Sequence, residues 1–191
     1  MAEQECAEQF VAAPVCTAAE APAHVPASPG YYAIFIDDPH SFLDPFCGLL
    51  VQRETRLIYL GIASRSLSQR LVKEDLQHRK PSTFFRGIGT ILDCRPMSGS
   101  LTGRKNQYNY KFSPTDTEKI IDWINVHLSV SWLEAQPTFN EEEELLIRKC
   151  MPIINTKHNP EPVQKLADLR LACRMIARTA PGRMDTLPTT E

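Results

Sequence analysis

The side chains best suited to chemistry in this 191-residue chain occur in an ordered series of short motifs. Gly30-Tyr31-Tyr32 and Tyr59-Leu60-Gly61 each combine tyrosine with glycine, and Arg70 follows the second motif closely. Later in the chain, Glu143 begins the spacing Glu-x-x-Leu-Ile, and Asn155 ends the spacing Pro-x-x-Asn. A guanidinium can bind a phosphate, a carboxylate can bind a divalent cation, and a tyrosine hydroxyl can orient water. Residues of these types can serve chemistry on a phosphate group.

Charge is segregated along the chain, although the net charge is only −2. Residues 65–111 contain ten basic and three acidic residues, whereas residues 113–144 contain eight acidic residues and one basic residue. A basic stretch beside an acidic one favours a polyanion-binding face with a carboxylate metal site nearby. The alternative is that the charges interleave in space and contribute only to solubility. Charge alone does not decide between the two.

The elements that must position these residues follow from the local sequence patterns. Short aromatic and β-branched runs predict three strands, at 31–36, 57–62 and 129–133. The spacing of apolar residues, with capping residues such as Ser66, Ser113 and Asn140, predicts helices. These helices are expected at about 66–77, 82–92, 113–128, 140–151 and 163–178. The predicted fold class is α+β, with a small three-stranded mixed sheet flanked by helices.

The two ends of the chain lack such patterns. Residues 1–29 are rich in Ala, Pro and Glu, and we predict a disordered N-terminal tail because they cannot bury enough apolar surface to offset their chain entropy. Residues 179–191 are predicted to behave in the same way. The expected organisation is a tail over 1–29, a domain over 30–160, and a C-terminal helix and tail over 161–191.

The ordered set of motifs resembles the GIY-YIG nuclease superfamily over roughly residues 30–159. The resemblance implies a metal-dependent endonuclease that hydrolyses phosphodiester bonds in DNA, with Mg²⁺ or Mn²⁺ as its cofactor. Matched position by position, it implies four catalytic residues: Tyr32, Tyr59, Arg70 and Glu143. Glu143 would be the metal ligand. Three further residues would support the site: Gly30, Gly61 and Asn155.

The chemistry of phosphodiester cleavage fits these residue types. A divalent cation neutralises charge on the leaving oxygen, and a lone carboxylate with several waters suits Mg²⁺. Arg70 can clamp the scissile phosphate through two hydrogen bonds. A tyrosine hydroxyl, with a reference pKa of about 10, needs activation by the metal or by Arg70 before it can deprotonate water.

The sequence departs from the superfamily pattern in two places. Residues 37–56 separate the tyrosine motifs, so an insertion or an extra hairpin must bulge out there. Many members carry histidine or tyrosine four residues after the arginine, where this chain has Glu74. His78 is a candidate for the vacant role, because intervals of four place Arg70, Glu74 and His78 on one helix face. The alternative is a solvated histidine at the helix end, with a tyrosine as the base.

Structural interpretations also exist for the motif residues taken singly. The tyrosines could only pack within strands, and Asn155 could end a turn. Glu143 lies three residues after Asn140, where a capping box places a glutamate anyway. Their occurrence together in the right order favours the superfamily fold.

The stretch 103–111 mixes cations, amides and aromatic rings, a combination that suits contacts with phosphates and bases. Five of its residues are expected to bind DNA: Arg104, Lys105, Asn106, Tyr108 and Lys111. An ordinary surface loop is the alternative.

Several classes of protein are disfavoured by the sequence. No apolar run approaches the roughly 18–20 residues of a spanning helix, and the N-terminus lacks the basic start of a secretory signal. The six scattered cysteines include no Cys-x-x-Cys pair, so reduced thiols in a cytoplasmic protein are expected. The expected partner is DNA, with no membrane, and the oligomeric state stays open. The alternatives to an active enzyme are a nucleic-acid-binding module with weak or no cleavage and, more distantly, a protein-interaction domain.

Overall fold

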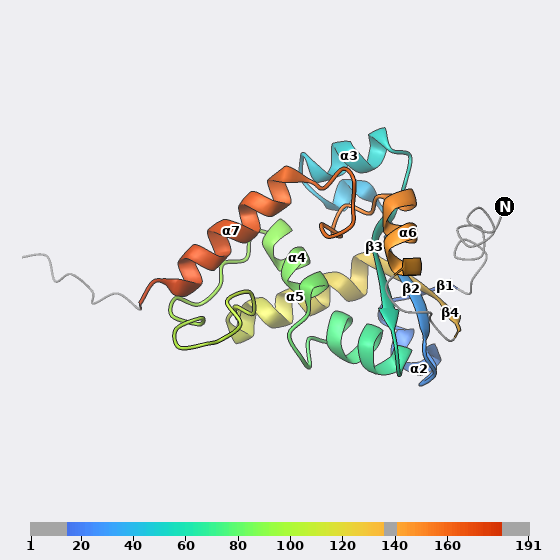
Figure 1. Cartoon of the computed structure of the whole chain (residues 1–191), viewed down its shortest axis with the longest axis horizontal. Coiled ribbons are helices and arrows are strands. Elements are labelled where there is room, and N and C mark those ends of the chain that lie inside the picture. Colours follow the sequence, from blue (N-terminus) through green and yellow to red (C-terminus); the bar gives the residue numbers. More distant parts are fainter. Residues whose placement is uncertain (1–14, 136–140, 181–191) are drawn as a thin grey trace, which may run out of the picture.

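A computed structural model describes residues 15–135 and 141–180 of the chain (Figure 1). Its centre is a sheet in the order β1-β4-β2-β3. The strands are β1 (Val15–Thr17), β2 (Gly30–Ile36), β3 (Leu57–Ala63) and β4 (Leu128–Glu134). The predicted α+β class is confirmed. The expected three-stranded mixed sheet is wrong in detail, because β1 adds a fourth strand and every pairing among the described strands is antiparallel.

Residues 15–29 are ordered and correct the prediction of a disordered tail over 1–29. β1 pairs with β4, and the short helix α2 (Ala21–His24) follows it. Ala18, Ala21 and Val25 are buried in the main core. Composition misled the prediction because small side chains can fit closely against a sheet without offering a large apolar surface. Residues 1–14 and 181–191 lie outside the described residues.

Helical segments connect and cover the strands. They are the 3₁₀-helix η1 (Pro39–Ser41), α3 (Phe46–Gln52), the π-helix η2 (Ser68–Leu76), α4 (Thr83–Ile91), α5 (Pro114–His127), α6 (Glu141–Cys150) and α7 (Gln164–Arg178). The hydroxyls of Ser82 and Ser113 accept backbone hydrogen bonds at the starts of α4 and α5, as capping requires. Asn140, the predicted cap of α6, lies outside the described residues. None of the described helices combines the length and apolarity needed to cross a membrane.

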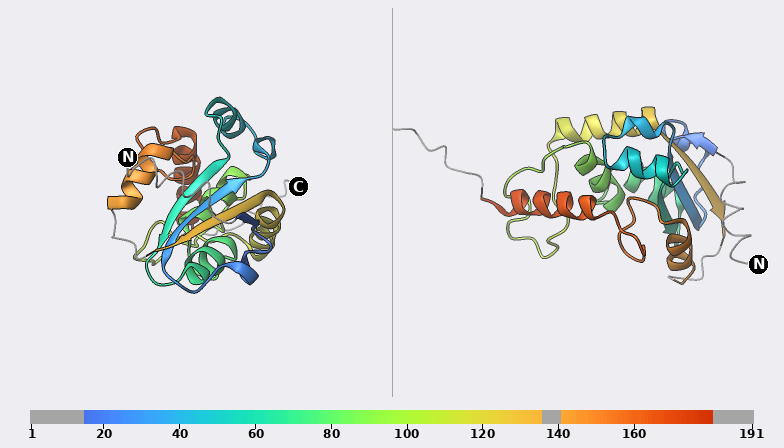
Figure 2. Two further views of the ribbon diagram at one scale, coloured as in Figure 1. Left: turned by 90° about the vertical axis from the view of Figure 1, so that its right-hand side faces the viewer. Right: turned by 90° about the horizontal axis from the view of Figure 1, so that it is seen from above.

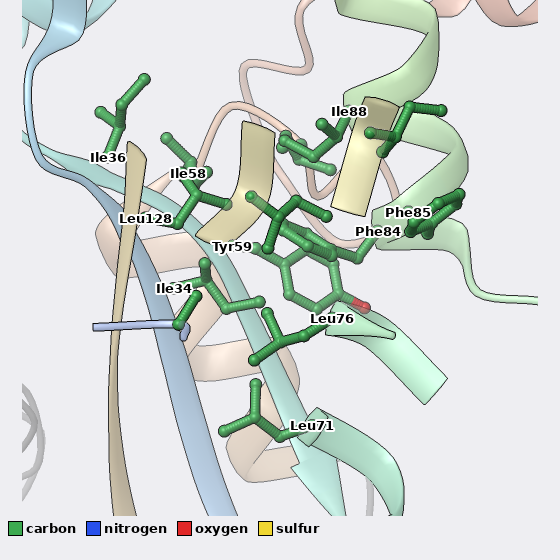
Figure 3. Close-up of a cluster of buried hydrophobic side chains, with 14 of the residues drawn as sticks. Ile34, Ile36, Ile58, Tyr59, Leu71, Leu76, Phe84, Phe85, Ile88 and Leu128 are labelled. Carbon is green, nitrogen blue, oxygen red and sulfur yellow. The ribbon is translucent and has the colours of Figure 1, made fainter. Parts of the chain in front are cut away.

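The sheet carries helices on both faces (Figure 2). Side chains alternate along β2, so Tyr32 and Ile34 enter the main core, whereas Tyr31 and Ala33 face the smaller cluster under α6. Figure 3 shows part of the main core, where side chains of the strands meet those of η2 and α4. α7 contributes Leu166, Cys173 and Ala177 to this core. The expected boundary at residue 160 therefore does not separate α7 from the rest of the fold.

Residues 37–56 form η1 and α3, and correct the expectation of a segment that bulges out. Phe42, Phe46 and Leu50 are buried in the main core. The ring of Phe42 stacks on Trp123 of α5, with 5.1 Å between the ring centroids. This insertion is therefore an integral part of the fold.

The helix predicted over 66–77 is observed as η2, which is a π-helix. The backbone N–H of Gln77 donates to the carbonyl of Val72, five residues earlier, at 3.0 Å. Its buried residues come in neighbouring pairs, Leu71-Val72 and Asp75-Leu76. The wider turn of a π-helix keeps both members of each pair on the inner face. Such turns are frequent at functional sites, and this one carries Arg70, Glu74 and Asp75.

The glycines of the two tyrosine motifs allow strands to approach closely. Tyr32 lies opposite Gly61 in the β2–β3 register. A Cβ atom at Gly61 would come within 2.4 Å of the Tyr32 hydroxyl oxygen, and one at Gly30 would come within 2.2 Å of the Leu133 carbonyl oxygen. Gly61 therefore leaves the space that the Tyr32 ring occupies.

We predict that Gly61→Ala destabilises the protein by about 1–3 kcal/mol, because the added methyl must displace a buried ring. Urea unfolding measures the effect. The matched control is Gly48→Ala in α3, where the nearest atom within reach is a side-chain oxygen of Asp44 at 3.2 Å. That control should change the free energy of unfolding by at most about 1 kcal/mol. Equal stability of Gly61→Ala and the unaltered protein would contradict the packing argument.

Candidate functional site

The carboxylate of Asp75, which is 0% exposed, joins three elements of the fold. The hydroxyl of Tyr32 in β2 donates to its Oδ2 atom at 2.5 Å, and the hydroxyl of Ser82 donates to Oδ1 at 2.5 Å. Arg70 Nη1 lies 3.2 Å from Oδ1. Burial raises the pKa of Asp75, while Arg70, Ser82 and Tyr32 act in the opposite direction. A buried carboxylate is tolerable when it is paired and hydrogen-bonded in this way.

Asp75 is not among the site residues predicted from the sequence, although its position in the sequence carries a signal. The residue lies among Leu71, Val72 and Leu76 on the apolar side of its helix. An acidic residue at such a position must find partners inside the protein.

Arg70 keeps part of its guanidinium available. Nη1 contacts Glu74 at 3.3 Å as well as Asp75, whereas Nε and Nη2 form no hydrogen bond with any described residue. Burial lowers the pKa of Arg70. Its electrostatic interactions with Tyr32, Asp75, Tyr59 and Glu74 raise the pKa by more than burial lowers it, so the net shift is upward. The side chain is 31% exposed. Arg70 is therefore a permanent cation with donors free for a ligand.

Glu74, at the position where many superfamily members carry histidine or tyrosine, is an ion-pair partner of Arg70. It also contacts Lys80 Nζ at 3.1 Å and accepts a hydrogen bond from Gln69 at 3.2 Å. Its observed contacts orient the guanidinium of Arg70.

Tyr59 of β3 differs from Tyr32 in the hydrogen bonding of its hydroxyl. Its ring packs against that of Phe84, with 5.2 Å between the ring centroids (Figure 3). It also packs against the ring of Tyr32, with 6.2 Å between the centroids. The Tyr59 hydroxyl forms no hydrogen bond with any described residue, whereas that of Tyr32 is bound to Asp75. Burial, and then the charge of Asp75, raise the pKa of Tyr59 well above its usual value. The group therefore stays a neutral hydroxyl at physiological pH.

Glu143 lies in α6, beside the edge strand β3 (Figure 1). Its half-buried carboxylate forms no hydrogen bond or ion pair with a described residue. The adjacent Glu144, in contrast, contacts Arg148 at 2.7 Å and His158 at 3.0 Å. Burial raises the pKa of Glu143, and the charges of His158, Lys157 and Arg70 lower it. Glu143 also raises the pKa of Tyr59, which places these groups within electrostatic reach of one another.

The donor set can be compared with the needs of a metal ion. The described residues contain no group of three or more His, Cys, Asp or Glu side chains that could hold one. Asp75 is occupied by its three partners, and Glu74 is paired with Arg70 and Lys80. Glu143 is the remaining carboxylate within electrostatic reach of Arg70, and it has no partner among the described residues. A single carboxylate fits Mg²⁺, which keeps several water ligands.

Asn155 connects the segment after α6 to β3. Its side-chain amide accepts a hydrogen bond from the Leu60 N–H and donates one to the Leu60 carbonyl, both at 2.9 Å. The Ile154 N–H donates to the Ile58 carbonyl at 3.0 Å. These bonds tie the chain just beyond α6 to the strand that carries Tyr59.

His78 does not join the cluster around Arg70. The helix η2 ends at Leu76, and His78 follows with a left-handed backbone at φ 52°, so the expected shared face with Arg70 and Glu74 is not formed. Its ring stacks on Phe85, with 4.0 Å between centroids. Burial, followed by the charges of Arg86 and Lys111, lowers the pKa of His78 to about 4. The hypothesis that His78 serves as general base therefore loses its geometric basis.

The loop predicted to bind DNA lies at the far end of the molecule from the sheet (Figure 1). It is attached to α7, because Leu101 N–H donates to the Ala177 carbonyl and Arg178 donates to Gln107. All five residues predicted to contact DNA have exposed side chains there: Arg104, Lys105, Asn106, Tyr108 and Lys111. The structure does not bring them to the Arg70 cluster.

The family model for the GIY-YIG catalytic domain matches residues 30–174. The chain therefore belongs to the GIY-YIG nuclease superfamily, whose members are endonucleases. The match includes most of α7. Neither a curated protein nor a solved structure shows a significant match to the chain.

The lowered pKa of His78 predicts a pH dependence of stability. The folded state binds fewer protons than the unfolded chain between the folded pKa of about 4 and the ordinary value of 6.5, so stability should rise with pH through this window. Allowing for partial exposure, we expect a gain of about 1–2 kcal/mol. Urea unfolding between pH 4.5 and 7 measures it.

His78→Asn should flatten this rise, because asparagine tolerates the left-handed backbone and does not titrate. His24→Asn, at an exposed position on α2, is the control and should retain the rise. An unchanged slope in His78→Asn would refute the assignment.

Proposed function

We propose that this protein is a metal-dependent DNA endonuclease that hydrolyses phosphodiester bonds. The observation that carries the proposal is the electrostatic coupling among Arg70, Tyr59 and Glu143, three residues from separate elements. The Tyr59 hydroxyl, the Glu143 carboxylate and the Nε and Nη2 atoms of Arg70 have no hydrogen-bonding partner among the described residues. Membership of a family of endonucleases supports the reaction class.

Arg70 would bind the scissile phosphate. Its Nη1 atom is fixed by Glu74 and Asp75, which leaves Nε and Nη2 to donate to phosphate oxygens. Because the nearby negative charges hold its pKa high, it keeps its charge throughout the reaction. A preorganised cation of this kind stabilises charge that develops on phosphate oxygens.

Tyr59, rather than Tyr32, would contact the attacking water. The Tyr32 hydroxyl is committed to Asp75, and its role is to hold the network that positions Arg70. The Tyr59 hydroxyl has no such commitment. Since its raised pKa keeps it protonated, it would orient water by hydrogen bonding and not by removing a proton.

Glu143 would hold Mg²⁺ or Mn²⁺ with water completing the coordination. When bound, the cation supplies positive charge that stabilises the leaving oxygen. Metal binding requires the ionised carboxylate, which the neighbouring His158, Lys157 and Arg70 favour.

Glu143→Gln should abolish Mg²⁺-dependent nicking of supercoiled plasmid, because the amide is a poor metal ligand of nearly the same shape. The thermal transition should change little. Glu142→Gln, one residue earlier in the same helix, is the matched control and should keep nicking. Cleavage by Glu143→Gln at the unaltered rate would remove Glu143 from the site. Salt-sensitive DNA binding without cleavage under any metal would favour the nucleic-acid-binding module instead.

The two tyrosines predict opposite phenotypes. Tyr32→Phe should lower the free energy of unfolding by about 1.5–3 kcal/mol, because it removes a hydrogen bond to a buried carboxylate. Tyr59→Phe should leave stability nearly unchanged and reduce the rate of cleavage at saturating metal by about 10-fold or more. Urea unfolding and plasmid nicking on both variants measure the difference. Loss of stability in Tyr59→Phe with normal cleavage per folded molecule would reverse the two assignments.

A further inference from the structure

Two arginines that the proposed reaction does not use meet at the start of α4. Arg86 Nη2 donates to the Thr83 hydroxyl at 3.4 Å, and Arg170 Nη2 donates to the Thr83 carbonyl at 3.4 Å. Arg170 also donates to the Ile154 carbonyl at 3.3 Å. Gly87 makes room for this arrangement, since a Cβ atom there would lie 2.7 Å from Arg170 Nη2. Residues far apart in the sequence thus bring two guanidinium groups to one residue.

These two positive charges have no directly contacting counter-charge in the described part of the chain, and Asp75 acts on Arg86 only at longer range. Neither arginine forms an ion pair with a described residue. Arg86 is only 7% exposed, and its Nη1 atom is buried without a hydrogen-bond partner, as is Nε of Arg170. Burial lowers the pKa of both, that of Arg170 to about 10. Unpaired buried cations are costly, and an anionic ligand would relieve that cost.

The surroundings also favour an anion. The nine-residue helix α4 begins at Thr83, and its first turn presents backbone N–H groups and the positive end of the helix dipole. Thr83 is exposed and Arg170 is partly exposed, so a ligand can approach from solvent. The preceding residue, Ser82, donates to Asp75, and Phe84 packs on Tyr59. The arginine pair therefore adjoins the proposed cleavage site.

We propose that Arg86 and Arg170, together with the start of α4, bind a second phosphate of the DNA strand, next to the scissile phosphate at Arg70. This inference rests on the proposed function. One helical turn farther along α7, Arg174 lies over the Tyr108 ring at 5.1 Å. α7 thereby links the second phosphate site to the remote loop at 103–111. The bound DNA strand would therefore run from Arg70 along α7 toward this loop.

Inorganic phosphate is the probe for this site, used on the full chain with Arg70→Ala to eliminate binding at the first site. At matched ionic strength, phosphate at about five times its dissociation constant should raise the melting temperature by about 2–4 °C relative to chloride. Adding Arg86→Met, or separately Arg170→Gln, should abolish that rise. The matched control adds Arg53→Gln, because Arg53 is a partly buried arginine that binds a backbone carbonyl but is paired with Glu161. The control should keep the rise.

A purely structural role for the pair makes a different prediction. Removal of an uncompensated charge by Arg86→Met should leave the melting temperature in chloride unchanged or higher, whereas a structural residue would lower it sharply. In a protein that keeps Arg70, the affinity for single-stranded DNA falls as salt rises. The slope of log affinity against log salt should become shallower by about 0.7 in Arg86→Met. It should stay the same in Arg53→Gln.

The outcomes separate this inference from the proposed function. A phosphate-induced rise that survives both arginine variants, or no rise in the Arg70→Ala protein, overturns the second site even if DNA is cleaved. Unfolding of both variants in chloride also overturns it. A rise that depends on both arginines supports the site, and it does so even if plasmid cleavage fails, which would count against the nuclease proposal alone.

Discussion

The buried carboxylate of Asp75 is the interaction on which the candidate site depends. It is the acceptor for Tyr32 from the sheet and for Ser82 from the start of α4, and it pairs with Arg70 on its own helix. A charge with no solvent contact must keep all its partners, because losing one leaves the rest uncompensated. Tyr32 and Ser82 thus hold the carboxylate that pairs with Arg70, so the position of Arg70 is set before any ligand arrives. The two tyrosines of the motifs then differ in kind: one completes this network, and the other is left with a hydroxyl to use.

Local sequence patterns predicted most of the fold. Strands at the tyrosine motifs and the helices capped by Ser82 and Ser113 follow from rules that act within a few residues. β1 and α2 could not be predicted in this way, because their stability comes from pairing with β4, more than a hundred residues later, and not from their own composition. The π-helical form of η2 was not predicted for a related reason. Its two pairs of adjacent buried residues favour a π-helix only because both members of each pair pack into the core of the folded protein.

The candidate site was predictable where it matched a known order of motifs, and less so elsewhere. Tyr59, Arg70 and Glu143 come from the recognised motifs, and they act on one another electrostatically. His78, in contrast, was assigned by a regular helical spacing, and the helix η2 ends two residues before it. The basic segment 65–111 is likewise not a single face. Arg70 lies in the site, Arg86 is inside the protein, and Arg104 is on a distant loop. Charge counted along a chain cannot anticipate such a division, because it is made by tertiary packing.

The hydrogen bonds between Asn155 and Leu60 have a consequence for self-association. β3 is the outermost strand on its side of the described sheet, and the exposed backbone groups of such a strand are a template on which another chain can pair. The amide of Asn155 acts as a surrogate peptide group there, and Ile154 continues the coverage at Ile58. The strand that carries Tyr59 is thereby shielded from aggregation through β-pairing, while its inner face stays free for chemistry.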